Sequence, residues 1–160
     1  MFVDVEVKDS DNAGKGCFTK QRIPKGAVVD IFPIEARIIK EEDYLKQQKN
    51  NHLVEQSGVR WVGNYFMIGY EICEDDFINH SDNPNLLYHC GICFAKRDID
   101  SGEELTVNYQ YFLSKKDNNL FTDCKTGRRI QTLSGKEALE QSTKELVQLL
   151  KELNEIPSLH

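Results

Sequence analysis

The stretch that decides the fold covers residues 77–112 and consists of two polar segments joined by apolar residues. The first segment reads Phe77-Ile78-Asn79-His80-Ser81-Asp82-Asn83-Pro84-Asn85, and the last reads Gly102-Glu103-Glu104-Leu105-Thr106-Val107-Asn108-Tyr109. The many Asn, Asp and Ser residues at 79–85, together with Pro84, are typical of a loop whose side chains hydrogen-bond to the backbone. Residues 86–88 and 92–95 are predicted strands, and residues 105–109 are predicted to be extended.

Taken together, these motifs point to a known family. Asn79-His80-Ser81 with Pro84-Asn85, followed by residues 102–106 and Tyr109, resembles the two signature motifs of the SET-domain protein lysine methyltransferases in order and spacing. The resemblance implies a mostly β SET-domain β-clip fold with few short helices. It also implies a pseudoknot, in which the second motif threads under a loop near the first and brings Asn, His and Tyr together at the cofactor.

The cofactor implied by the resemblance is S-adenosyl-L-methionine. Residues 14–18 and 23–26 resemble a Gly-x-Gly hairpin and a turn of the same family, and glycines let the backbone approach a ligand closely. The residues expected to bind the cofactor are Gly14, Lys15, Gly16, Asn79, His80, Tyr109 and Phe112. Phe112 or Phe121 is the candidate for packing against the adenine.

Tyr109 occupies the family's catalytic position, and Tyr88 and Tyr111 match positions that line the substrate lysine channel in some members. Methyl transfer to an amine needs a neutral amine, in-line alignment within roughly 3–3.5 Å and exclusion of water. Free lysine has a pKa of about 10.4, so an aromatic channel that removes water favours the neutral amine. The resemblance implies that a tyrosine at the end of the channel limits how many methyl groups are added, and that it stands at position 107 or 88. Because Val107 has no ring, Tyr88 is the candidate for this tyrosine, and we expect mainly monomethylation.

The domain prediction places the SET domain at residues 1–112 and a C-terminal segment at residues 113–160. Ser134 and Glu137 form a capping-box pattern, and leucines follow at helical spacing. This pattern predicts an amphipathic helix over about residues 135–154 that ends near Pro157. Farther back, residues 3–7 and 27–32 are predicted strands, and the charged residues 40–51 a short helix.

Composition restricts the class of protein and of partner. The chain has 160 residues, 39% hydrophobic residues and a formal net charge of −6, and it contains no apolar run near the roughly 20 residues that span a bilayer. We therefore expect no membrane partner, no direct nucleic-acid binding, and a basic protein or peptide substrate, with histone as the family default. An acidic charge kept for solubility alone is an equally good explanation. Five cysteines without a secretion signal favour reduced thiols in an intracellular location, cytoplasmic or nuclear.

The remaining motifs receive simpler interpretations. Cys90-Gly91-Ile92-Cys93 matches a Cys-x-x-Cys pattern, but it falls in a predicted hairpin with no second pair nearby, and only Cys124 follows Tyr109. We therefore expect no metal site. His80 beside Ser81 is not a hydrolase pair, because neighbouring residues rarely face each other and no third partner is visible.

Two alternatives stay open: a catalytically silent SET-fold module that binds a peptide or partner, and an unrelated acidic all-β binding protein.

Overall fold

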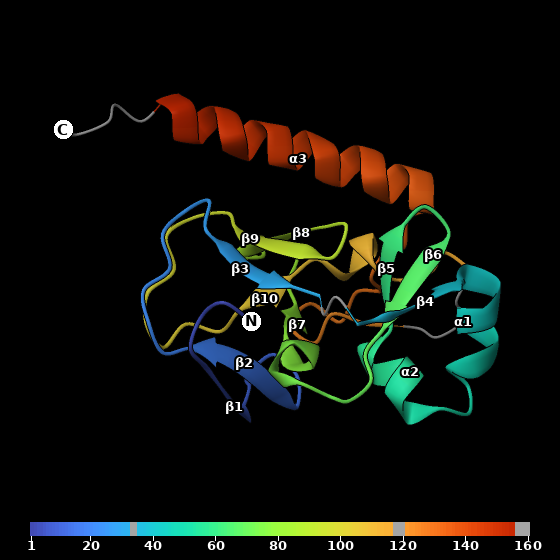
Figure 1. Ribbon diagram of the computed structural model, residues 1–160. Helices are drawn as coiled ribbons and strands as arrows, with labels where there is room; N and C mark the ends of the chain where they lie inside the picture. The colour runs from blue at the N-terminus through green and yellow to red at the C-terminus, as the bar shows by residue number, and fades with distance from the viewer. Residues whose placement is uncertain (33–34, 117–120, 156–160) are drawn as a thin grey trace.

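The structure is a computed structural model that describes residues 1–32, 35–116 and 121–155. Small sheets form the body of the described fold (Figure 1). β1 (Val5–Asp9) and β2 (Lys15–Thr19) pair antiparallel. A second sheet has the order β3 (Val28–Ile31), β9 (Ile92–Ala95), β8 (Leu86–His89), and a third has the order β4 (Arg37–Lys40), β6 (Tyr65–Ile68), β5 (Val59–Val62). The mostly β prediction is confirmed.

Helices are few and mostly short. They are α1 (Glu41–Gln47), α2 (His52–Ser57), the 3₁₀ turns η1 (Glu74–Phe77) and η2 (Tyr109–Tyr111), and the long α3 (Gly135–Glu155). The sequence predicted one short helix over residues 40–51, whereas α1 ends at Gln47 and α2 begins at His52. The reason is Asn51, whose side-chain oxygen accepts hydrogen bonds from the backbone N–H groups of Leu53 and Val54 and so starts a new helix.

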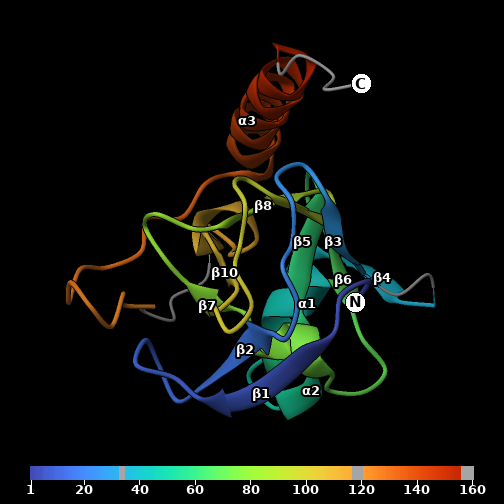
Figure 2. The ribbon, with the colours of Figure 1, turned by 90° about the vertical axis from the view of Figure 1, so that its left-hand side faces the viewer.

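The C-terminal helix is confirmed, together with its cap. Ser134 N donates to Glu137 Oε2 (2.7 Å), and Glu137 N donates back to Ser134 Oγ (3.3 Å), which is the reciprocal capping box. The predicted end near Pro157 lies outside the described residues. α3 lies across β8, η2 and one end of β5, at the opposite end of the molecule from the β1–β2 hairpin (Figures 1 and 2). Ala138 and Leu146 of α3 pack into the main core.

The two motifs meet in the fourth sheet. β7 (Asn79–His80) and β10 (Thr106–Val107) run parallel, with Thr106 opposite Asn79 and Val107 opposite His80. Ser81 N then donates to Val107 O (3.0 Å). Parallel pairing over so short a distance places the residues before Tyr109 beside the Asn-rich loop, which is the expected pseudoknot arrangement.

The hydrophobic core lies between these sheets and α3. Its buried residues are Cys17, Ile23, Val29, Ile78, Leu86, Leu87, Tyr88, Cys93, Ala95, Ile99, Leu105, Val107, Tyr111 and Ala138. A second cluster joins the two short helices to β6, where the rings of Tyr44 and Phe66 stack with centroids 4.1 Å apart. Within the ranges that the structure covers, no helix has the length and apolar character to cross a membrane.

Candidate active site

The carboxylate of Glu104 joins the β1–β2 hairpin to the first motif. Its Oε1 accepts hydrogen bonds from Ser10 Oγ (2.7 Å) and Asn79 Nδ2 (2.8 Å), and its Oε2 accepts one from Asn12 Nδ2 (2.6 Å). A Cβ added at Gly16 would overlap the same carboxylate. Because three hydrogen bonds hold the carboxylate in place, a side chain at position 16 would have to displace it, so glycine is required there.

Asn79 fixes the loop between β1 and β2. Besides its bond to Glu104, Asn79 Nδ2 donates to the backbone oxygens of Ala13 (3.2 Å) and Lys15 (3.0 Å). The side chain is buried, so each of these bonds also satisfies a polar group that water does not reach. One amide therefore ties residues 13–15 to β7.

Asn85 fixes the second motif in the same manner. Its Oδ1 accepts from Thr106 N (2.9 Å), and its Nδ2 donates to Glu104 O (2.8 Å). The side-chain amide of Asn85 thus makes the hydrogen bonds that a neighbouring strand would otherwise make to the backbone at Glu104 and Thr106. This arrangement explains why an Asn-rich loop stands beside a very short strand.

His80 orients the backbone of Tyr109. His80 Nδ1 accepts a hydrogen bond from Tyr109 N (3.2 Å), which requires that Nδ1 carry no proton. The other ring nitrogen, Nε2, lies 3.3 Å from Asp82 Oδ1 and 3.9 Å from Asp123 Oδ2. The ring is therefore held from both sides at the point where β10 ends and η2 begins.

Tyr109 is held at both its backbone and its hydroxyl. Its hydroxyl donates to Ile78 O (2.9 Å), and its ring centroid lies 4.8 Å from that of Phe112 and 6.5 Å from that of Phe121. Burial, with smaller contributions from Cys124 and Glu104, raises the pKa of Tyr109 to about 12. The phenol therefore stays protonated at neutral pH.

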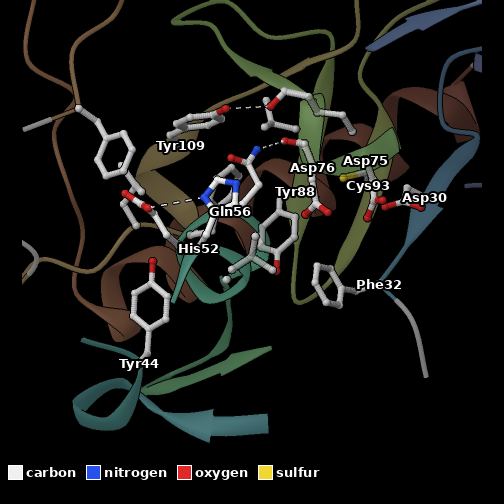
Figure 3. A pocket seen from close by; sticks show the side chains of 18 residues that line it. Asp30, Phe32, Tyr44, His52, Gln56, Asp75, Asp76, Tyr88, Cys93 and Tyr109 are labelled. Carbon is white, nitrogen blue, oxygen red and sulfur yellow. Dashed lines mark hydrogen bonds and ion pairs between the residues drawn. The ribbon is translucent and has the colours of Figure 1, made fainter. Parts of the chain in front are cut away.

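Two cavities share Tyr109 and Phe121 in their walls. The motif cavity, of about 230 Å³, is otherwise lined by Asn12, Ala13, Asn79, His80, Thr122, Asp123, Cys124, Lys125 and Ile130. The aromatic cavity, of about 420 Å³, is otherwise lined by Asp30, Phe32, Tyr44, His52, Glu55, Gln56, Gly58, Val59, Asp75, Asp76, Ile78, Tyr88, Cys93, Val107, Phe112 and Leu113 (Figure 3). The hydroxyl of Tyr88 points away from Tyr109 in this view and donates to Arg60 O (2.5 Å).

The structure brings some of the predicted site residues together. Asn79 and His80 line the motif cavity, Tyr109 lines both cavities, and Tyr88 lines the aromatic cavity. Gly14, Lys15 and Gly16, in contrast, do not line the motif cavity themselves; Asn12 and Ala13 of the same loop do.

Two aromatic residues after Tyr109 lie where the sequence did not predict. Phe112 lines the aromatic cavity and not the motif cavity, with its ring edge-on to Tyr88 at 5.3 Å. Tyr111 lines neither cavity, because it is buried toward α3 and its hydroxyl bonds to Glu145. The reason is η2: in a 3₁₀ turn residues three apart lie on one side, so Phe112 returns to the side of Tyr109 and Tyr111 does not.

Sequence reasoning also missed part of the motif cavity. Asp123, Lys125 and Ile130 belong to a turn held by Asp123 Oδ1, which accepts from Thr126 N (2.6 Å) and Thr126 Oγ1 (2.6 Å). The signal in the sequence is Asp123 three residues before Thr126, with Gly127 after it, a pattern common in turns. Nothing in that pattern indicates which cavity the turn would close.

Carboxylates line the aromatic cavity in two places. Asp30, Asp75 and Asp76 lie together (Figure 3), whereas Glu55 lies in α2 beside His52. Asp30 also pairs with the α-amino group of Met1 (3.0 Å). Burial raises the pKa of Asp75, and it raises the pKa of Asp76 from 3.8 to about 7. Burial therefore favours the neutral form of these two carboxyl groups, whereas Glu55 is exposed to water.

The cysteines of the described chain are free thiols. Cys90 (φ 51°) and Gly91 (φ 87°) form the tight turn between β8 and β9, so the Cys-x-x-Cys pattern belongs to a hairpin. Among the residues that the structure describes, no group of three or more His, Cys, Asp or Glu side chains could hold a metal ion.

Comparison with known proteins agrees with this geometry. The family model of the SET domain matches residues 14–110. The chain belongs to the SET domain family. The variant-silencing SET domain-containing protein of Plasmodium falciparum (isolate 3D7) is 30% identical over 127 residues, which cover 68% of this chain and 5% of that protein.

A second relative carries an enzyme name. The histone-lysine N-methyltransferase, H3 lysine-36 specific, of Mycosarcoma maydis is 30% identical over 127 residues, covering 68% of this chain and 12% of that protein. The chain thus spans a small fraction of the length of both relatives. The similarity extends beyond residues 14–110 and supports the SET fold for most of the chain.

The buried carboxyl of Asp76 predicts a pH dependence of stability. Its pKa is raised on folding, so between about pH 4 and about pH 7 the folded state holds a proton that the unfolded state has lost. The free energy of unfolding therefore falls as the pH rises through this window. Asp76→Asn keeps an acceptor for Cys73 N (2.8 Å) without the charge, and we expect a shallower fall, measured by urea unfolding at several pH values.

The control for this measurement is Asp11→Asn, which changes an exposed aspartate in the β1–β2 turn. It should keep the pH dependence of the unchanged protein. Equal slopes for Asp76→Asn and the unchanged protein would show that Asp76 ionises normally in the folded state.

Proposed function

We propose that this SET domain transfers a methyl group from S-adenosyl-L-methionine to a lysine side chain of a protein substrate. The observation that carries the proposal is the position of Tyr109 in a wall common to two cavities. A reaction between two separately bound molecules needs the reacting atoms aligned at one point and water kept out. A cavity on each side of one buried hydroxyl meets both needs.

The motif cavity fits the cofactor. It combines polar groups of Asn79 and His80 with the apolar side chains of Phe121 and Ile130 and the carboxylate of Asp123. That donor set suits a molecule with a charged amino-acid end and a flat heterocycle. When bound, S-adenosyl-L-methionine supplies a methyl group already activated on a sulfonium. Asn79, His80 and the backbone near Gly14, Lys15 and Gly16 would hold it, with Phe121 against the base.

The aromatic cavity suits the substrate lysine. The rings of Tyr88 and Phe112, with Val107, form an apolar wall beside Tyr109, and such a wall disfavours the charged ammonium. The carboxylates that line this cavity, the exposed Glu55 among them, would attract the ammonium on entry. Once the amine has lost its proton, its lone pair would be free to accept the methyl group that the bound cofactor supplies. Tyr109 Oη, still protonated and donating to Ile78 O, keeps a lone pair that can accept an amine N–H and aim the nitrogen.

We further propose mainly monomethylation. Tyr88 is 6% exposed, and its hydroxyl is fixed on Arg60 O, so its ring cannot swing out of the cavity without breaking a buried hydrogen bond. A fixed ring facing Phe112 leaves little room for a methylated amine. Tyr88 thus limits the product state through the position of its ring.

The substrate is proposed to be a basic protein. The carboxylates near the aromatic cavity and the net charge of −6 both favour a Lys/Arg-rich segment. The enzyme name of the fungal relative supports histone as the first protein to test, and with it an intracellular, nuclear location. The SET unit is proposed to occupy residues 1–112 and the C-terminal segment to begin at residue 113, with its helix α3 packed on the core.

Removal of one hydroxyl tests the reaction. The unchanged protein should transfer label from S-adenosyl-L-methionine to histones or to proteins of a whole-cell extract. Tyr109→Phe should lower the rate at least about a hundredfold, because the group that aims the amine is lost. Tyr111→Phe is the matched control, since its hydroxyl faces α3, and it should retain transfer. Cofactor binding without any transfer by the unchanged protein would identify a silent binding module instead.

Cofactor binding is tested separately by calorimetry with S-adenosylhomocysteine. Asn79→Ala removes the amide that holds the Ala13 and Lys15 carbonyls, so we expect at least about tenfold weaker binding at one site per chain. Asn83→Ala changes an exposed residue of the same loop and is the control. Equal affinities of both variants would place the cofactor elsewhere.

Product state is tested on Tyr88. Tyr88→Phe removes the bond to Arg60 O and frees the ring, so transfer should continue while the product shifts from monomethyl-lysine toward dimethyl-lysine. Mass spectrometry of a methylated peptide measures the shift. Trimethyl-lysine as the main product of the unchanged protein would show that Tyr88 does not limit methylation.

A further inference from the structure

Arg60 and Glu41 form a buried ion pair in the segment between β4 and β6, and both side chains also bond to residues that follow Tyr109. Arg60 of β5 is 2% exposed, the largest fully buried side chain among the described residues. Its Nη2 lies 3.1 Å from Glu41 Oε1 at the start of α1, and both side chains are almost inaccessible to water. A pair buried to this degree needs many further hydrogen bonds to offset lost hydration.

The backbone of Arg60 holds both aromatic walls of the aromatic cavity. Arg60 N donates to Phe112 O (3.2 Å), and Arg60 O accepts from the hydroxyl of Tyr88 (2.5 Å). The Tyr88 and Phe112 rings meet edge-on at 5.3 Å beside Tyr109. One residue outside both signature motifs therefore holds the backbone of Phe112 and the hydroxyl of Tyr88, whose rings face the substrate amine in the proposed reaction.

The side chain of Arg60 holds the same segment more firmly. Nη2 also donates to Leu113 O (3.0 Å), and Nη1 donates to Gly63 O (2.6 Å). Glu41 Oε1 accepts in addition from Ser114 Oγ (2.9 Å). The planar guanidinium thus binds two carbonyls and a carboxylate at once, a geometry that the single ammonium of Lys cannot reproduce.

This network is better suited to fixing positions than to maximum stability. Arg60 Nε is buried and has no hydrogen-bond partner within the part of the chain that the structure describes. Although burial acts to raise the pKa of Glu41, hydrogen bonds from Ser114, Lys116 and Arg60 hold that pKa below its ordinary value. The pair is therefore charged in the folded state, and an apolar pair of similar volume could be equally stable.

We propose that Arg60 and Glu41 are positioning residues that hold Tyr88 and Phe112 in place in the wall of the aromatic cavity. They thereby limit how many methyl groups the substrate lysine can receive. This inference rests on the proposed function and extends it to residues that touch neither substrate nor cofactor. None of the partners of Arg60 lines the motif cavity, so cofactor binding should not depend on the pair.

The test compares Arg60→Lys, which keeps the charge, with Glu41→Gln, which keeps the shape. In both, the ratio of dimethyl-lysine to monomethyl-lysine on a peptide should rise at least about tenfold, the discrimination that one methyl group gives in a shaped pocket. Mass spectrometry measures the ratio. The affinity for S-adenosylhomocysteine should stay within about twofold of the unchanged protein.

Two further variants separate positioning from folding. Lys25→Met removes an ion pair with Glu152 of α3 (2.5 Å), far from the aromatic cavity, and should leave the product ratio unchanged. The double variant Glu41→Met with Arg60→Met replaces the pair by apolar side chains, so it should fold even if the single variants do not. It should still show the raised dimethyl ratio.

The outcomes are distinct. A purely structural role would lower the folded fraction and the number of cofactor sites per chain while leaving the product ratio unchanged, and that result would overturn the proposal. So would trimethyl-lysine as the main product of the unchanged protein. Absence of transfer by the unchanged protein would overturn the proposed function as well, whereas an active protein with an unchanged ratio in every folded variant overturns only the role of Arg60 and Glu41.

Discussion

The hydrogen bond between Asn79 and Glu104 is the constraint on which the rest of the site depends. These residues belong to different motifs, and Glu104 also accepts from two residues of the β1–β2 loop. A carboxylate with three donors forms charge-assisted bonds, which are stronger than neutral ones. Loss of either partner would leave a poorly hydrated polar group without its bond, a cost of about 1–3 kcal/mol. Three segments far apart in sequence are therefore fixed by one contact.

The position of Tyr109 follows from this contact. Once Asn79 and Glu104 are joined, β7 and β10 pair in parallel, and the chain leaves β10 beside His80. His80 then accepts the backbone N–H of Tyr109, and the hydroxyl reaches Ile78 O, one residue before the first motif. The backbone N–H and the hydroxyl of Tyr109 thus both bond to residues 78–80. The position of Tyr109 in the wall shared by the two cavities is therefore a consequence of the pseudoknot.

Local patterns in the sequence predicted several of the regular elements. Residues 86–88 and 92–95 became β8 and β9, and the Ser134–Glu137 pattern began α3 where expected. These patterns depend only on residues that are close in sequence, so they can be recognised without knowledge of the fold. The joint motif also indicated the family, because its two parts must meet in space to form the pseudoknot.

The walls of the two cavities were harder to predict because they depend on how the chain turns after each motif. An extended chain would place Tyr111 on the side of Tyr109, whereas the 3₁₀ turn η2 places Phe112 there. Likewise Gly16 faces the Glu104 carboxylate, so Asn12 and Ala13 line the motif cavity in its place. Packing also joins parts that the sequence treats separately, because Ala138 and Leu146 of α3 share the core with Tyr111.

The aromatic cavity sets two opposing demands on a lysine side chain. Its carboxylates favour the charged ammonium, whereas its rings favour the neutral amine that can react. Both kinds of group line the same cavity: Asp30, Asp75 and Asp76 come from β3 and η1, while Tyr88 comes from β8 and Phe112 follows η2. The rings favour the neutral amine only if they stay in place, since water admitted beside them would favour the charged ammonium again. The backbone of Arg60 bonds to both Tyr88 and Phe112, which is why a buried ion pair outside the motifs bears on the chemistry at Tyr109.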